Sequence, residues 1–210
     1  MKISVIVLIV VLTAFGFSCN EAKPTKNSSS STSGIKKGVA PVADNEVAVI
    51  EMENSSAYGT ITIELYSNIA PKMVARFKEL AKEGVYNGTS FHRINQTVVQ
   101  GGDPNSKDDD PSNDGTGNSD KPNVQAEFSD IPYDTAIVGA ARQSGDVNSQ
   151  NSQFFIMLKR EVGFDKNYTV FGKVIEGMNN VRTISGVSPK EGERPVEAIK
   201  IKSVTIKPKG

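Results

Sequence analysis

The sequence predicts a mainly β protein, a closed antiparallel barrel of eight strands capped by two helices. Short runs that are apolar throughout, or in which apolar and polar residues alternate, recur along the chain. Only two segments place apolar residues at helical spacing, and no internal repeat is present. Closing the sheet would remove the exposed strand edges that otherwise invite aggregation.

The first elements are a strand around Val47 and Val49 and a second over 60–65, which alternate polar and apolar residues. A hairpin through 54–56 would join them. A helix is expected to begin at Pro71, a residue that suits the first helical position, and to end at Gly84. Its core-facing residues would be Met73, Phe77, Leu80 and Ala81.

Five short apolar runs then predict strands, over 91–94, 97–99, 136–141, 153–158 and 169–174. A long surface loop, rich in Asp, Asn, Ser and Gly, is expected over 104–121. A second helix is predicted over 176–185, and a strand over 196–206 closes the chain. The apolar phase of that last strand slips between Ile201 and Val204, which predicts a β-bulge there.

The composition favours one globular domain with no charge bias toward a partner. The chain has 210 residues, 37% of them hydrophobic, and a formal net charge of zero. This length suffices for a sizeable core, and the balanced charge gives no attraction to nucleic acid or to an anionic membrane surface.

The N-terminus reads as an export signal. An apolar run over 3–17 follows Lys2 and is too short to span a bilayer comfortably, and Cys19 stands where such a signal would be cleaved. We expect residues 1–18 to be a signal peptide, Cys19 to be a lipid anchor, 19–43 to be a flexible tether and 44–210 to be the folded domain. Gly16 departs from the usual lipidation motif, and a plain secretory signal or an uncleaved anchor is the alternative.

Conventional catalytic machinery is absent from the predicted domain. It contains no cysteine, no second histidine beside His92, no G-x-S-x-G motif and no phosphate-binding loop. Covalent and metal catalysis are therefore not expected, and no cofactor is implied. The acidic stretch 108–114 could gather oxygens for Ca²⁺ but lacks EF-hand spacing, so a solvated loop is the alternative.

Five blocks nevertheless occur together in an ordered arrangement. They are Phe91-His92-Arg93, Gln100-Gly101-Gly102-Asp103, Gly115-Thr116-Gly117, Asn151-Ser152-Gln153-Phe154-Phe155-Ile156 and Val170-Phe171-Gly172-Lys173-Val174. In order and spacing they resemble the cyclophilin-type peptidyl-prolyl isomerases, over essentially 45–207. The resemblance implies an eight-stranded closed barrel with a helix at each end, and an enzyme that rotates X-Pro bonds without breaking a covalent bond.

The resemblance also implies roles for individual residues. Arg93 would be the catalytic guanidinium, Gln100 would hold Arg93 or the substrate backbone, and Gln153 would hydrogen-bond the peptide. Phe155 would form the floor of the proline pocket, although it could instead belong to the barrel core. His92 lies near the groove in the family, but a purely structural histidine is an equal alternative.

Several positions depart from the family pattern. The usual Phe-Met pair before the glutamine becomes Thr97-Val98 or Val98-Val99, depending on where a one-residue gap is placed, so Val98 and Val99 are both candidate pocket residues. Phe164 stands one place after the position of the expected aromatic residue, and Tyr168 replaces a frequent histidine. The pocket for the residue before proline would be bordered by Ala141, Arg142 and Gln143.

Together these features predict a monomeric, lipid-anchored isomerase of the bacterial cell envelope, periplasmic or surface-exposed, that acts on proline-containing segments of exported proteins. A rival is a module or chaperone that binds proline-containing peptides with little turnover, because the altered pocket favours binding over catalysis. A third possibility is an unrelated β-barrel lipoprotein that binds a small ligand.

Overall fold

The computed structural model describes residues 34–188 and 190–210, which belong to one compact unit. The predicted signal peptide, Cys19 and the first part of the predicted tether lie outside the described residues. Within the described part of the chain, no helix has both the length and the apolar character needed to cross a membrane.

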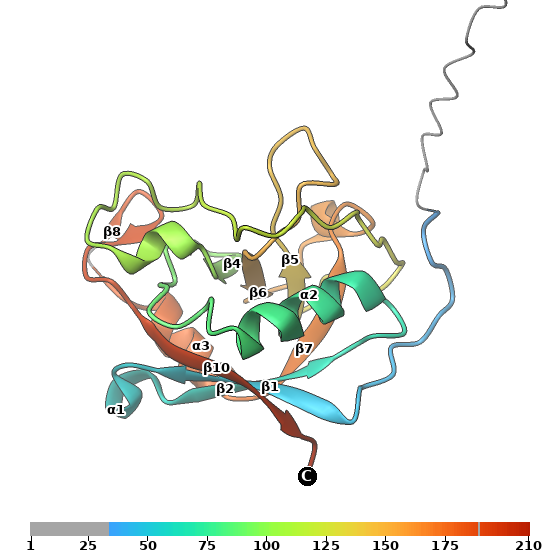
Figure 1. The fold of residues 1–210 in the computed structure, drawn as a ribbon, viewed down its shortest axis with the longest axis horizontal. Coiled ribbons are helices and arrows are strands. Elements are labelled where there is room, and N and C mark those ends of the chain that lie inside the picture. The colour runs from blue at the N-terminus through green and yellow to red at the C-terminus, as the bar shows by residue number, and fades with distance from the viewer. Residues whose placement is uncertain (1–33, 189) are drawn as a thin grey trace, which may run out of the picture. The chain divides into compact units, whose positions relative to one another are not determined.

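The protein is mainly β and is built on one sheet of eight antiparallel strands (Figure 1). The strand order in the sheet is β10-β1-β2-β7-β5-β6-β4-β3. The strands are β1 (Glu46–Met52), β2 (Thr60–Leu65), β3 (Arg93–Ile94), β4 (Val98–Gly101), β5 (Ile137–Ala140), β6 (Phe154–Met157), β7 (Val170–Glu176) and β10 (Ile201–Pro208).

The sheet is a curled half-barrel, so the prediction of a closed barrel is wrong. No strand pairing joins its two edge strands, β10 and β3, among the described residues. β3 has only two residues, and its free edge is taken by the hairpin of β8 (Lys190–Glu191) and β9 (Arg194–Pro195): the Ile94 N–H donates to the Glu193 carbonyl at 2.6 Å. The segment before β3 reaches the start of β10: the Gly88 N–H donates to the Ile201 carbonyl at 2.8 Å, and the Ile201 N–H donates to the Thr89 carbonyl at 2.7 Å.

Helix α2 (Pro71–Lys82) packs its apolar side into the fold, as predicted, and Figure 1 shows it crossing beside β10, β1 and β2. Its buried residues are Met73, Val74, Phe77, Leu80 and Ala81. The buried Glu127 carboxylate caps its N-terminus by accepting from the N–H groups of Lys72, at 3.1 Å, and Met73, at 3.0 Å. These donors have no partner inside a helix, so the carboxylate satisfies groups that burial would otherwise leave unpaired.

The other helices are shorter. Helix α3 (Met178–Ser185) buries Val181 and Ile184 and agrees with the second predicted helix. Helix α1 (Ser55–Tyr58), capped by Asn54, stands where a plain hairpin between β1 and β2 was expected. Two 3₁₀ turns follow β4 and β6, over Pro104–Lys107 and Val162–Phe164.

The sheet has apolar clusters on both faces because side chains alternate along each strand. On β6, Phe154 and Ile156 join the inner cluster with α2, whereas Phe155 and Met157 face the other way. We call this second group the outer cluster; its buried members are Tyr66, Ile69, Val98, Ile131, Tyr133, Ile137, Phe155, Met157 and Val170.

The predicted β-bulge in the last strand is confirmed. Glu51 pairs with Ser203 and Met52 pairs with Ile201, so Lys202 is the inserted residue. The insertion lets Ile201 and Val204, which are three positions apart, both point inward and become buried.

The end of the predicted tether contacts the folded domain. The Lys36 ammonium donates to the carbonyls of Asn68 and Ile69, at 3.1 and 2.7 Å, and the Lys36 N–H donates to Phe128 at 2.9 Å. The Gly38 N–H donates to the Asp130 carboxylate at 2.8 Å. Polar groups thus hold part of the segment 36–42 against the domain, and the boundary at residue 44 stays a prediction.

Candidate active site

Strand pairing places Arg93, Gln100 and Phe155 in one row. Arg93 on β3 lies opposite Gln100 on β4, and Gln100 lies opposite Phe155 on β6. The side chains connect as well: Arg93 Nη1 donates to Gln100 Oε1 at 3.2 Å, and Gln100 Nε2 donates to Gln153 Oε1 at 3.0 Å. The row thus links a guanidinium to two amides and an aromatic ring.

The row ends on the loop 115–117. Gln153 Nε2 donates to the carbonyls of Gly115 and Gly117, at 3.1 and 2.8 Å. The fully buried Asp103 carboxylate accepts from the N–H groups of the same two glycines. A side chain at Gly117 would meet Asn105 Cγ at 2.7 Å, so the close packing requires glycine there. Gln153 therefore binds the carbonyl groups of Gly115 and Gly117, and Asp103 binds their N–H groups, so the loop is held in place through its backbone.

The guanidinium of Arg93 borders a small hollow of about 80 Å³, which we call the aromatic hollow. Its rings pack edge to face: Phe155 meets Phe164 and Tyr168 with centroids 5.5 Å apart in each case. Tyr133 stacks behind Phe155 at 5.8 Å. The lining residues are Arg93, Val98, Gln100, Ala141, Arg142, Phe155, Phe164 and Tyr168, and all of them were singled out from the sequence.

The structure separates the two valines that the sequence left as alternatives. Val98 shares a face of β4 with Gln100 and lines the aromatic hollow. Val99 points the other way, is fully buried and belongs to the inner cluster, where it pairs with Ile156. Val99 is therefore not a pocket residue, because alternation along β4 puts it on the opposite face.

His92 also differs from expectation. Phe91 and Ile94 both lie in the inner cluster, so the segment is not a regular strand and simple alternation does not apply before Arg93. His92 is 6% exposed, does not line the aromatic hollow, and its ring nitrogens have no hydrogen-bond partner among the described residues. Burial lowers the pKa of His92, so the ring is neutral at physiological pH.

A second hollow of about 320 Å³, lined mostly by polar residues, adjoins the first and shares Gln100, Ala141 and Arg142 with it. We call it the polar hollow. Arg142 lies between the two, with its guanidinium carbon 4.7 Å from the Tyr168 ring centroid. The other lining residues are Gly115, Thr116, Asn118, Gln143, Ser144, Ser149, Asn151 and Gln153.

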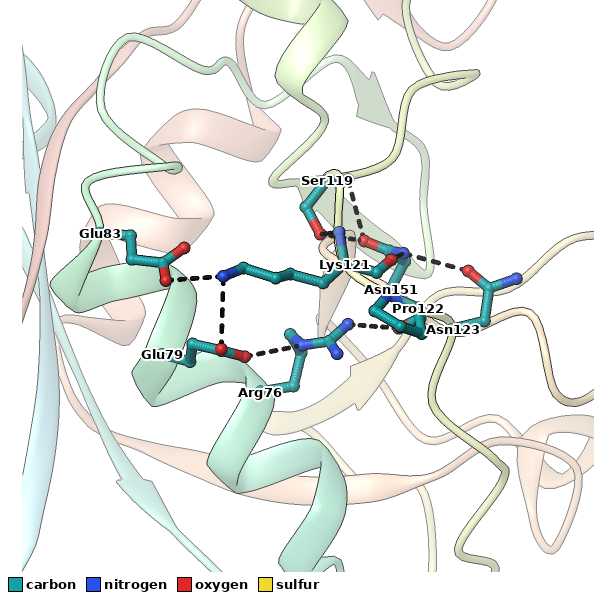
Figure 2. Close-up of polar contacts among 8 residues, drawn as sticks. All are labelled: Arg76, Glu79, Glu83, Ser119, Lys121, Pro122, Asn123 and Asn151. Carbon is teal, nitrogen blue, oxygen red and sulfur yellow. Dashed lines mark hydrogen bonds and ion pairs between the residues drawn. The ribbon is translucent and has the colours of Figure 1, made fainter.

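Asn151 holds one wall of the polar hollow (Figure 2). Its Oδ1 accepts from the Ser119 N–H and hydroxyl, at 2.9 and 2.6 Å. Its Nδ2 donates to the Lys121 carbonyl at 2.9 Å and to Asn123 Oδ1 at 3.0 Å. At 3% exposure this side chain is buried, so its four contacts fix the segment 119–123 against the loop that precedes β6.

Figure 2 also shows the same segment tied to α2 by charged side chains. Arg76 Nη1 donates to the Pro122 carbonyl at 2.7 Å and pairs with Glu79 at 3.2 Å. The Lys121 ammonium pairs with Glu79 and Glu83, at 3.5 and 2.8 Å. The segment 119–123 is thus held by Asn151 on one side and by α2 on the other.

One site residue was missed from the sequence. Arg93 Nε donates to the Glu193 carboxylate, and Asn95 Nδ2 donates to the other carboxylate oxygen at 2.8 Å. Glu193 lies 100 residues from Arg93 in a stretch with no motif or periodicity, so no sequence signal pointed to it. The hydrogen bonds from Asn95 and Arg93 lower the pKa of Glu193.

A model of the family described as "Cyclophilin type peptidyl-prolyl cis-trans isomerase/CLD" matches residues 49–206. The chain belongs to the cyclophilin-type peptidyl-prolyl isomerases. The half-barrel, the helix α2 and the row from Arg93 to Phe155 are therefore parts of a cyclophilin, and the protein is a peptidyl-prolyl cis-trans isomerase.

Relatives and solved structures agree with this assignment. The chain is 42% identical over 153 residues to a probable peptidyl-prolyl cis-trans isomerase of Brucella suis, covering 70% of this chain and 78% of the relative. It is 35% identical over 151 residues to the human peptidyl-prolyl cis-trans isomerase-like 1, covering 70% and 86%. A crystal structure of a Cryptosporidium parvum cyclophilin with the dipeptide Ala-Pro has a TM-score of 0.68 and 27% identity, covering 78% of this chain and 99% of that one.

Proposed function

We propose that this cyclophilin isomerises X-Pro bonds with Arg93 as its catalytic residue and the aromatic hollow as its proline pocket. The observation that carries the proposal is that the Arg93 guanidinium and the Phe155 ring border the same hollow. An apolar hollow excludes water around the proline ring, while a single polar group at its edge contacts the reacting amide.

The chemistry requires only stabilisation of a twisted bond. Rotation about an X-Pro bond faces a barrier of about 18–20 kcal/mol because the amide loses its resonance. In the twisted state the prolyl nitrogen becomes a better hydrogen-bond acceptor than in either planar state. An N–H of Arg93 that reaches this nitrogen binds the transition state more strongly than the ground state, and such differential binding accelerates the reaction.

Gln100 and Gln153 would orient the partners of this step. Gln100 accepts from Arg93 and so restricts the guanidinium, and Gln153 carries the connection to the loop 115–117. The polar hollow would receive the residue before proline, with Ala141, Arg142 and Gln143 on its border. Arg142 and Gln143 make that subsite more polar than a small-residue wall would.

The test is isomerase activity of the purified protein and of Arg93→Ala, in a protease-coupled peptide assay and in a proline-limited refolding assay. We expect Arg93→Ala to lower kcat/KM by about 100-fold, the loss typical of a single transition-state donor. Lys82→Ala, at the exposed end of α2, is the control for loss of a charged side chain and keeps wild-type activity. Wild-type activity in Arg93→Ala refutes the catalytic assignment, and peptide binding without turnover in the wild-type protein supports the binding-module alternative.

The proposed cellular setting is the bacterial envelope, where a lipid on Cys19 would hold the enzyme beside exported proteins with exposed X-Pro segments. Its support is the sequence alone: an apolar run over 3–17, a single cysteine directly after it, and a polar segment before the domain. Mass spectrometry of the mature protein tests it, because acylation adds a defined mass to an N-terminal Cys19. An unmodified N-terminus at any other residue contradicts the anchor.

A further inference from the structure

We propose that Glu193 is a positioning residue for isomerisation, because its carboxylate holds the Arg93 guanidinium at the edge of the aromatic hollow. The inference rests on the proposed catalytic role of Arg93. It adds a fourth residue, supplied by the β8–β9 hairpin, to the row of Arg93, Gln100 and Phe155.

The contacts grip the guanidinium from two sides. Arg93 Nε donates to one oxygen of Glu193, and Nη1 donates to Gln100 Oε1 at 3.2 Å. No described residue accepts a hydrogen bond from Nη2, so that end of the guanidinium is left for a substrate. The second oxygen of Glu193 accepts from Asn95 Nδ2 at 2.8 Å, which fixes the carboxylate itself.

The backbone places Glu193 at this position. Its carbonyl accepts from the Ile94 N–H at 2.6 Å, so the residue binds β3 through its main chain and its side chain together. In the hairpin, Glu191 pairs with Arg194 across a turn that contains Gly192 and Glu193. A change in the side chain at 193 therefore leaves the backbone contact in place, which makes a clean test possible.

Arg93 needs such a contact because packing does not immobilise it. Its side chain is 43% exposed and that of Glu193 is 46% exposed. A long side chain in that environment samples many rotamers, and hydrogen bonds must select the productive one. Solvent also screens the attraction between the two exposed charges. The main contribution of Glu193 is therefore the orientation that its hydrogen bond gives to the Arg93 guanidinium.

Other charged groups surround the pair, and each bears on its pH dependence. Arg194 from the same hairpin and Asp114 from the acidic loop lie 4.0 Å apart. Together with Glu191 and the neutral His92, they line a separate hollow that Arg93 and Glu193 also border. Arg182 of α3 lines another hollow, together with Asn95 and Glu193.

The sign of the pH effect follows from the pKa of Glu193. Hydrogen bonds from Asn95 and Arg93 lower the pKa of this carboxyl below its ordinary value of 4.5. The pairing is therefore complete at neutral pH and is lost as the pH falls through that lowered pKa. Glu193→Gln removes this titration.

The experiment measures kcat and KM of the full chain for an Ala-Pro peptide. We expect Glu193→Ala to lower kcat by about 5- to 20-fold with little change in KM, because a misplaced guanidinium affects mainly the transition state. Glu193→Gln should lower it by less than about 3-fold at pH 7, since the amide oxygen still accepts from Nε, and its kcat should lack the acid limb of the wild-type profile. Glu197→Gln, at an exposed position that follows the same hairpin, is the matched control for removal of a charge.

Two readouts separate positioning from a general structural role. In an Arg93→Ala background, Glu193→Ala should cost nothing further, whereas a structural role would lower the residual activity by the same factor again. In the NMR spectrum, the Arg93 Nε–H should exchange slowly with solvent in the wild-type protein and fast in Glu193→Ala.

The outcomes distinguish this inference from the proposed function. If Arg93→Ala is inactive while Glu193→Ala keeps or exceeds wild-type kcat, only the positioning role is overturned. If Arg93→Ala remains fully active, the proposed function fails first. A loss in Glu193→Ala that repeats in the Arg93→Ala background also overturns the inference.

Discussion

Replacing Gly139 by alanine is expected to lower kcat/KM by about 5- to 150-fold, because the added methyl group occupies space that the Phe155 ring now fills. Gly139 on β5 lies directly opposite Phe155 on β6. A Cβ at this position would stand 2.7 Å from Phe155 Cε2 and 2.8 Å from the Tyr133 hydroxyl. Gly139 does not have a positive φ, so the effect is steric rather than a backbone strain.

The magnitude follows from these distances. Carbon atoms in contact prefer about 3.5–4.0 Å, so the ring must shift by roughly 1 Å. Phe164 and Tyr168 pack against its edges, and the space left to it is the aromatic hollow of about 80 Å³. Overpacking of this kind costs about 1–3 kcal/mol. At about 1.36 kcal/mol per factor of ten, this free energy corresponds to a 5- to 150-fold loss of kcat/KM when it opposes substrate binding.

The assay is the protease-coupled isomerisation of an Ala-Pro peptide, with thermal unfolding measured on the same samples. Gly186→Ala is the matched control, since Gly186 has a φ of −80° and its added Cβ would meet its nearest atoms at an ordinary 3.5 Å. Combining Gly139→Ala with Phe155→Leu should recover part of any lost Tm by making room for the methyl group. Wild-type values of kcat/KM and Tm in Gly139→Ala would refute this prediction, because they would mean that the Phe155 ring does not pack against Gly139.

Two further predictions concern the wall of the polar hollow and the attachment of α2. Asn151→Ala should lower the free energy of unfolding by about 1–3 kcal/mol, since Ser119 and Lys121 lose their hydrogen-bond partner. It should also change the ratio of kcat/KM between peptides that differ only in the residue before proline. An unaltered ratio would mean that the segment 119–123 keeps its position without Asn151. Burial alone would raise the pKa of Asp44, but hydrogen bonds from Lys78 and Ser67 lower it below its ordinary 3.8, so its stabilisation is present at neutral pH and is lost as the pH falls through the lowered pKa. Asp44→Asn should therefore reduce the free energy of unfolding by about 1–3 kcal/mol at pH 7 and by much less near pH 2, as measured by urea unfolding beside the exposed control Asp120→Asn; an equal loss at both pH values would contradict an ionic origin.

Much of the site could be predicted because its residues occur in short blocks with regular strand pairing. Arg93, Gln100 and Phe155 each lie in a quoted motif, and the antiparallel pairing of β3, β4 and β6 brings those motifs side by side. The bulge at Lys202 was also visible, because Ile201 and Val204 cannot both point inward on a regular strand.

The remaining features depend on contacts between distant segments. The choice between Val98 and Val99 depends on one residue of register, which the pairing of Val99 with Ile156 decides. Closure of the barrel was predicted wrongly because the hairpin that covers β3 has no strong strand signal of its own. Glu193 could not be foreseen, since an exposed glutamate in a charged stretch resembles any solvated side chain until the fold brings it to Arg93.

The apolar clusters on the two faces of the sheet differ in how completely they are covered. The inner cluster is sealed by α2, whereas the outer cluster around Phe155 keeps a vacancy at its surface. In the proposed function, a prolyl ring that enters this hollow packs against the outer cluster and adds a layer to it that another chain supplies. Such a site would bind its substrate by apolar packing, so it should accept prolines from many unrelated sequences and should release each one after isomerisation.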